Sequence, residues 1–133
     1  MLRVVGLIPV SAIVSNYANL VPIPTCVEEE QMNKLAMLQE ILAQNPTDSF
    51  ARYGLAMEYS GSGQTEQALG EFDQLAKDHP DYVPGYFMAA QTLARVGRTD
   101  DAKKRLQVGI AAAERTGNAH AQGEMQEMLD ELS

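Results

Sequence analysis

Apolar side chains recur at helical spacing along most of the chain, with polar positions between them. One such stripe, typical of a helix that packs on one side, comprises Ala68, Leu69, Phe72, Leu75 and Ala76. From residue 32 onward no alternation with a period of two residues is sustained, so no strand is expected there. The spacing predicts six helices, over residues 30–44, 48–61, 65–78, 82–96, 99–115 and 118–131.

The pattern repeats with a period of 34 residues. Five residues recur identically at this offset: Pro46 as Pro80, Ala56 as Ala90, Gly63 as Gly97, Thr65 as Thr99, and Ala68 as Ala102. A fixed period in this range is typical of repeat proteins, in which each unit buries its apolar face against its neighbours. Such proteins present surface to partners and rarely perform chemistry on their own.

The predicted helices are bounded by recognisable start and stop residues. Gly63 and Gly97 follow the first helix of each unit, where the chain often needs a positive φ. Thr65 and Thr99 are expected to cap the second helix by accepting hydrogen bonds from its free N–H groups. Pro80 ends a second helix, because the residue before a proline is pushed out of the α region.

These residues and their order resemble the tetratricopeptide repeat (TPR). The matching positions are Leu55, Ala56, Tyr59, Gly63, Ala68, Phe72 and Pro80 in the first unit, and Tyr86, Ala89, Ala90, Leu93, Gly97, Ala102 and Leu106 in the second. Residues 34–46 resemble the second helix of a preceding unit, and residues 118–131 resemble a closing helix. The resemblance implies an all-α fold: a short right-handed α-solenoid of antiparallel helix pairs, with two full TPR units, a preceding half unit and a C-terminal capping helix.

Four residues depart from the family pattern. Arg52 stands where a large aromatic side chain is usual, and Leu75 and Gly109 stand where the second helix prefers alanine. Glu114 replaces the terminal proline of the second unit. Without that proline, the helix that contains Glu114 is expected to run on without a sharp stop.

Residues 1–31 do not follow the helical pattern, and we separate them as an N-terminal extension from a TPR-like domain at 32–133. The extension is apolar over Val4–Val14. It is interpreted as a start-site extension or disordered tail upstream of a natural start at Met32, as an export or membrane-anchoring segment, or as an ordered segment that packs on the first helix. A good cleavage site, the small residues a lipoprotein needs before Cys26, and the length of a membrane span are all missing. We therefore expect a cytoplasmic protein, exported or membrane-anchored only if this extension serves that purpose.

The charge of the chain narrows its partners. The formal net charge is −8 and the pI is about 4.6, so an electrostatic nucleic-acid footprint is not expected. The basic cluster at Lys103, Lys104 and Arg105 is interpreted as a solvated helix face. Its charges are expected to pair with Asp100 and Asp101 one turn earlier.

No catalytic or metal-binding pattern stands out. His79 and His120 are the only histidines, and the group Asp78, His79 and Asp81 lacks the paired-ligand spacing of zinc sites. The phosphate-binding, nucleophile and metalloprotease motifs are also missing. We therefore predict that the chain is not an enzyme, and we expect no catalytic residue, no metal ligand and no cofactor.

In proteins that this chain resembles, the first helix of each unit lines a concave groove. The implied groove positions are Phe50, Tyr53, Met57 and Ser60 in the first full unit, Phe87, Gln91, Ala94 and Arg95 in the second, and Ala121, Met125 and Met128 on the closing helix. An exposed patch of this composition is typical of a site for an apolar peptide or helix. The competing interpretation is that Tyr53 and Phe87 simply pack on the adjacent helices.

The groove positions disfavour one known mode of binding. Family members that clamp a chaperone's C-terminal carboxylate use Lys, Arg and Asn there, whereas this chain has Tyr53, Gly54 and Met57. Arg95 is a single cation and cannot reproduce a clamp for two carboxylates.

Two hypotheses for the function follow. The first is a non-enzymatic protein–protein interaction scaffold that binds an apolar or amphipathic peptide segment in the groove. The alternative is a self-associating or obligate structural subunit of a larger complex that uses its terminal helix faces. A protein or peptide partner is thus expected, a homo-oligomer is compatible with the alternative, and light scattering separates the two. An enzymatic function has no positive support.

Phe72 is the predicted core anchor of the first unit. Phe72→Ala is expected to lower the free energy of unfolding by about 3–5 kcal/mol, because it removes a buried ring and leaves a cavity. Thermal melts followed by circular dichroism measure the effect. An unchanged melting temperature would show that Phe72 is not a core residue.

Overall fold

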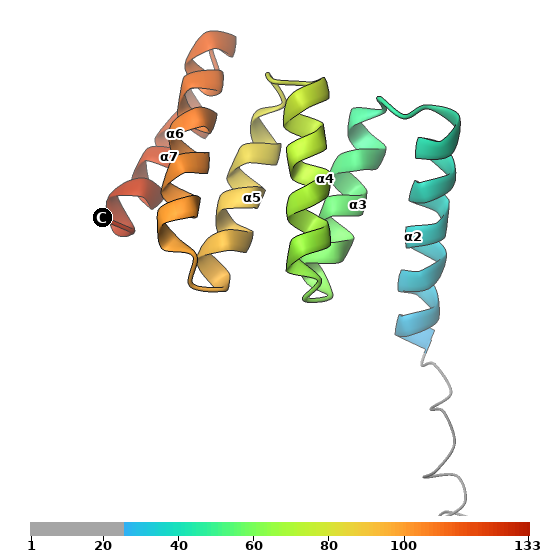
Figure 1. Cartoon of the computed structure of the whole chain (residues 1–133). Coiled ribbons are helices and arrows are strands. Elements are labelled where there is room, and N and C mark those ends of the chain that lie inside the picture. Colours follow the sequence, from blue (N-terminus) through green and yellow to red (C-terminus); the bar gives the residue numbers. More distant parts are fainter. Residues whose placement is uncertain (1–25) are drawn as a thin grey trace, which may run out of the picture. The chain divides into compact units, whose positions relative to one another are not determined.

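The computed structural model describes residues 26–133, and their side chains from Glu29 onward. Six helices follow one another in this part of the chain (Figure 1): α2 (Cys26–Gln44), α3 (Ser49–Gly61), α4 (Thr65–Asp78), α5 (Val83–Arg95), α6 (Thr99–Thr116) and α7 (Ala119–Glu131). The prediction of an all-α solenoid is therefore confirmed. The alternatives for residues 1–31 fall outside the described residues, except where α2 begins.

The helix α2 begins at Cys26, four residues earlier than the sequence pattern predicts. The acidic run at residues 28–30 lies in its first turns, where the helix dipole favours negative charge. Met32 is consequently an interior residue of a helix and not its start. No helix within residues 26–133 combines the length and the hydropathy needed to cross a membrane.

Residues 31–133 form one compact unit in which consecutive helices stand side by side (Figure 1). The pairs α3–α4 and α5–α6 turn at Gly63 and Gly97, whose φ angles of 79° and 82° confirm the expected left-handed conformation. The helix α2 packs on α3 through Leu38 and Leu42, and Lys34 of α2 forms an ion pair with Glu58 of α3 at 2.5 Å.

The predicted caps at Thr65 and Thr99 are wrong. The residues that precede α4 and α6 are Gln64 and Arg98, neither side chain caps the helix, and the two threonines are already helical. The preceding glycines turn the chain so sharply that the carbonyls of Gln64 and Arg98 accept the first helical hydrogen bonds, from the N–H groups four residues on, at 3.0 Å. Each threonine is therefore the first residue of its helix, one position after the site from which a side chain could cap it.

Small residues line the crossings between helices. Alanines with no exposed surface occur on four of them: Ala51, Ala56, Ala68, Ala89, Ala90, Ala102, Ala112 and Ala113. Large side chains fill the space between these close contacts, above all Phe72, Leu75, Leu106 and Met125. The burial of Ala56, Ala90 and Phe72 agrees with their predicted places in the core.

Gly109 marks the tightest of these crossings. A Cβ atom built on Gly109 would lie 2.6 Å from the sulfur of Met125 on α7 and 2.7 Å from the Cβ atom of Tyr86 on α5. Both distances are shorter than any normal contact, so only glycine lets α5, α6 and α7 meet at this point. This departure from the family's alanine is thus a packing requirement.

Arg52, another departure from the family pattern, ties three segments together. Its guanidinium donates to Glu71 of α4 at 2.6 Å and to the carbonyl of Pro46, before α3, at 2.7 Å. The side chain is mostly buried, which makes this ion pair less screened than a surface pair. A fork of hydrogen bonds therefore stands where the family usually places an aromatic ring.

The spacing of the first helices changes along the chain. The helix α5 begins at Val83, 34 residues after α3 begins at Ser49. The helix α7 begins at Ala119, 36 residues after Val83. The cause lies in α6, which has 18 residues against 14 in α4 because no proline stops it. The expectation that α6 lacks a sharp stop is wrong, since it ends at Gly117 with a φ of 72°.

The glycine contact predicts opposite effects for two similar substitutions. Gly109→Ala is expected to lower the free energy of unfolding by about 1–3 kcal/mol, because the new methyl group overlaps Met125 and Tyr86. Gly70→Ala in α4 meets nothing within 4 Å and is expected to raise stability by about 0.5–1 kcal/mol through helix propensity. Urea denaturation of both variants measures the difference. Equal effects would contradict the packing role of Gly109.

Candidate peptide-binding groove

Three predicted groove residues form one stripe along α3. Phe50, Tyr53 and Met57 lie at i, i+3 and i+7, and the side chain of Phe50 is 74% exposed. The ring of Tyr53 packs edge-on against Phe72 at 6.5 Å and lies 5.4 Å from the ring of Tyr82. Burial, with a smaller contribution from Tyr82, raises the pKa of the Tyr53 phenol and keeps it neutral. Tyr53 is therefore half core and half surface, whereas Phe50 is free to meet a partner.

A hollow of about 380 Å³ lies between α5, the first helix of the second unit, and the closing helix α7. Phe87 and Gln91 line it from α5, and the α7 side consists of Glu124, Glu127, Met128 and Glu131. Phe87 and Met128 also pack against the core, so they form a fixed apolar floor. We name this feature the α5–α7 hollow, and the side of the molecule formed by α3, α5 and α7 the first-helix face.

The structure brings together some of the predicted residues and separates others. Phe87, Gln91 and Met128, all three implied as groove positions, line the α5–α7 hollow together. The three glutamates of the hollow were not predicted as groove residues. Their signal in the sequence is the unbroken absence of Lys and Arg from α7, combined with acids at i, i+3 and i+7.

The prediction that Met125 lines the groove is wrong. Met125 has no exposed surface and lies in the core beneath α5 and α6, where Gly109 makes room for its sulfur. The 36-residue spacing explains the error, because it aligns Met125 with the buried Ala89 and aligns Glu127 with Gln91. Two extra residues rotate a helix by roughly 200°, which exchanges its core and surface faces.

Arg95 is exposed on α5, but its charge points away from the α5–α7 hollow. Its guanidinium donates to the carbonyl of Ser60, at the C-terminal end of α3, over 3.2 Å. Ser60, another implied groove residue, is itself buried and donates its hydroxyl to Thr92 at 2.7 Å, since Thr92 donates onward to Met88. These bonds hold α3 against α5 and leave the hollow without a cation from Arg95.

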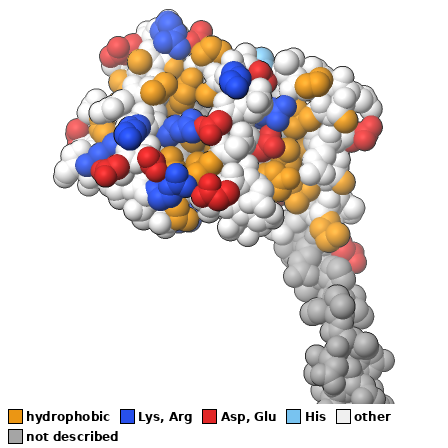
Figure 2. Space-filling model, viewed as in Figure 1, with side chains coloured by type: hydrophobic (Ala, Val, Ile, Leu, Met, Phe, Trp, Pro, Cys, Tyr) orange, Lys and Arg blue, Asp and Glu red, His pale blue; other side chains and the backbone are white. Residues whose placement is uncertain are grey.

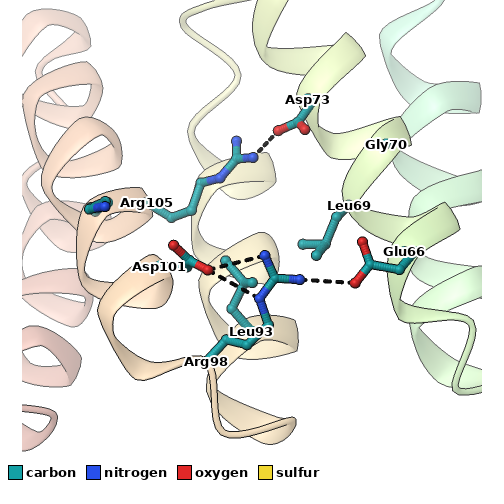
Figure 3. Close-up of a pocket in the computed structure, with 9 residues that line it drawn as sticks. Glu66, Leu69, Gly70, Asp73, Leu93, Arg98, Asp101 and Arg105 are labelled. Carbon is teal, nitrogen blue, oxygen red and sulfur yellow. Dashed lines mark hydrogen bonds and ion pairs between the residues drawn. The ribbon is translucent and has the colours of Figure 1, made fainter.

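A second hollow, of about 410 Å³, lies between α4 and α6 and is lined by ion pairs (Figure 3). Arg98, which precedes α6, binds Glu66 of α4 at 2.9 Å and Asp101 of α6 at 3.1 Å. Seven residues after Arg98, Arg105 of α6 forms an ion pair with Asp73 of α4. Both guanidinium groups therefore form ion pairs that connect adjacent repeat units.

The interpretation of Lys103, Lys104 and Arg105 as a solvated face is wrong for Arg105. Its side chain crosses to Asp73 instead of pairing with Asp101 one turn earlier, and burial lowers the pKa of its guanidinium. The arginine side chain thus spans the gap between α6 and α4, whereas the neighbouring Lys104 is exposed. Figure 2 shows acidic and basic side chains beside one another on this side of the molecule.

His79, at the C-terminal end of α4, connects two turns of the chain. Its Nε2 lies 2.6 Å from the carbonyl of Thr47, to which it donates, so the ring bridges the turns before α3 and after α4. Asp81 nearby pairs with Arg115 at 2.6 Å. Within residues 26–133 no group of three or more His, Cys, Asp or Glu side chains is arranged to hold a metal ion.

Comparison with known proteins places this architecture. A tetratricopeptide repeat model matches residues 59–123. The solution structure of a tetratricopeptide repeat domain protein from Salinibacter ruber is 32% identical, with 67% of this chain and 90% of that chain covered and a TM-score of 0.63. The chain belongs to the TPR family.

Two further similarities extend this assignment. A TPR repeat-containing protein of Pseudomonas aeruginosa is 25% identical over 95 residues, which cover 71% of this chain and 90% of the relative. The type III secretion chaperone SycD of Yersinia enterocolitica, solved with a peptide of the translocator YopD, has the same fold. Its TM-score is 0.70 at 17% identity, with 92% of this chain and 87% of that chain covered.

The different places of Met125 and Gln91 predict different losses of stability. Met125→Ala is expected to lower the free energy of unfolding by about 2–5 kcal/mol, because it empties a fully buried site. Gln91→Ala, at the edge of the α5–α7 hollow, is expected to change it by less than about 0.5 kcal/mol. Denaturant melts followed by circular dichroism compare the two. A small effect at Met125 would place that side chain back on the surface.

Proposed function

We propose that this TPR-family protein is a non-enzymatic interaction scaffold whose first-helix face binds an apolar or amphipathic peptide segment. The observation that carries the proposal is that the first helices carry both an exposed aromatic ring, Phe50 on α3, and a hollow with an apolar floor, Phe87 and Met128 of α5 and α7. Exposed aromatic rings and fixed apolar pockets are the usual anchors of peptide recognition.

Neighbouring structures support a peptide as the ligand. The SycD structure holds a peptide of YopD, so a helical repeat of this fold can serve as a peptide receptor in that protein. The α3, α5 and α7 helices also adjoin one another in order, which gives a segment of several residues a continuous surface to follow. The protein or peptide partner of this chain is inferred on that basis.

The first-helix face does not suit a carboxylate clamp. Tyr53 and Met57 are uncharged, and a Cβ atom built on Gly54 would lie 3.1 Å from Leu38 of α2, so this position packs against α2. Arg95, the one cation implied there, is bound to the carbonyl of Ser60. We therefore propose that recognition depends on apolar contact and not on capture of a chain terminus.

Self-association is the second candidate function. Met32 and Met37 on α2 are 61% and 57% exposed, so the outer surface of α2 offers apolar area for a second copy or a neighbouring subunit. Light scattering over a range of protein concentrations tests it. A mass that stays that of one chain at every concentration would remove this candidate.

Two exposed apolar residues allow a matched test of the groove. A photoreactive amino acid at Phe50 or Gln91 is expected to crosslink the partner in cells, whereas the same group at Val108, 53% exposed on α6, is not. For the partner so identified, Phe50→Ala is expected to weaken binding by about tenfold, a typical loss for an aromatic anchor, and Val108→Ala to leave it unchanged.

Both substitutions remove exposed apolar surface, so a general loss of non-specific hydrophobic binding would affect both variants. Circular dichroism melts confirm that each variant folds, which is expected because neither side chain is buried. Crosslinking that is as strong at Val108 as at Phe50 and Gln91, or binding that Phe50→Ala does not weaken, would contradict the proposed groove.

A further inference from the structure

We infer that the segment bound in the α5–α7 hollow is cationic, with lysine or arginine side chains beside its apolar ones. This inference rests on the proposed function and adds the chemical class of the partner. It comes from the charges that line the hollow and from the way the rest of the molecule uses its own cations.

Three carboxylates form one edge of the hollow. Glu124, Glu127 and Glu131 lie at i, i+3 and i+7 on α7, so they form a single row about 10 Å long. The apolar floor of Phe87 and Met128 lies in the same hollow. A ligand that enters it therefore meets apolar surface and negative charge at the same time.

The row is not neutralised by the described part of the chain. Glu124 has a histidine, His120, at 3.3 Å, which is charged only when protonated. Among residues 29–133, Glu127 and Glu131 form no ion pair, and α7 contains no Lys or Arg. Carboxylates one turn apart repel each other, and cations supplied by a ligand would relieve that repulsion.

The carboxylates on the opposite pair of helices are treated differently. Glu66 of α4 pairs with Arg98 at the start of α6, and Asp73 of α4 pairs with Arg105 of α6 (Figure 3). The molecule thus satisfies its acids where α4 and α6 adjoin and leaves those of the α5–α7 hollow open. The cation nearest in sequence to the hollow-lining residues of α5, Arg95, is engaged at the end of α3.

The spacing of the row indicates how a ligand would be arranged. Successive glutamates of the row lie three and four residues apart, about 5–6 Å on a helix surface. Lysines at i and i+4 of an amphipathic helix have the same spacing, with apolar residues on the adjacent face. An anionic segment would be repelled, and a neutral apolar one would leave the row unpaired.

Fluorescence anisotropy with three labelled peptides tests the inference on the full chain. The peptides are about 15 residues long and share a leucine stripe at i, i+3, i+4 and i+7, and the positions that flank the stripe are all lysine, all glutamine or all glutamate. The lysine peptide is expected to bind more tightly than the glutamine peptide, and the glutamate peptide not measurably. Added salt is expected to weaken only the lysine peptide.

A double variant locates the charge effect. Glu127→Gln with Glu131→Gln is expected to weaken binding of the lysine peptide by about threefold to tenfold, the range for two exposed pairs, and to leave the glutamine peptide unaffected. The control is Glu40→Gln with Glu114→Gln, which removes two exposed carboxylates from α2 and α6 and changes the net charge equally. The control is expected to bind both peptides as the natural chain does.

The outcomes separate this inference from the proposed function. Equal binding of the lysine and glutamine peptides, both crosslinked from position 91, would overturn the cationic partner and leave the peptide groove standing. An equal loss in both double variants would show attraction by net charge alone and overturn it too. Failure of every peptide to bind, or a second copy of the chain that excludes them, would overturn the inference, and the crosslinking from Phe50 would then decide the proposed function.

Discussion

The close approach of neighbouring helices at small residues is the constraint on which the rest of this structure depends. Alanines without exposed surface lie at the crossings, and at Gly109 even a methyl group is too large, because Met125 and Tyr86 occupy the space. Dispersion contacts fall off steeply with distance, so helices must lie this near to each other for the larger side chains to fill the core. The repeat of 34 residues is the sequence record of that constraint.

The length of one helix determines which residues reach the first-helix face. Because no proline ends α6, it extends to Thr116, and α7 begins two residues later than the period requires. Asn118 then starts α7 by accepting a hydrogen bond from the N–H of Ala121 at 3.1 Å, as Asp48 starts α3. The shift turns Met125 inward and Glu127 outward, so the acidic edge of the α5–α7 hollow follows from a missing proline more than a turn away.

The sequence predicts well whatever depends on local backbone geometry and on burial. The helices, the positive φ of Gly63 and Gly97, and the burial of Ala56 and Phe72 could all be inferred from spacing. It predicts poorly whatever depends on a change of register or on a partner across a helix crossing. The 34-residue period places Met125 in the groove, but α7 begins two residues later than that period requires. The ion pair of Arg105 with Asp73 joins two helices whose relative position cannot be inferred from local sequence pattern.

The closing helix has two duties that act on each other. One face of α7 carries Met125 into the core against Gly109, and another carries Glu124, Glu127 and Glu131 to the α5–α7 hollow. A substitution that expands the Gly109 crossing must therefore move the acidic row away from Phe87 and Gln91, although no residue of the hollow has changed. Among the described helices α7 packs only on α5 and α6, so its place in the stack depends on these two crossings. Affinity for a ligand in the hollow and the stability of the C-terminal cap should accordingly rise and fall together, because a ligand that bridges α5 and α7 stabilises the same contact that Gly109 makes possible.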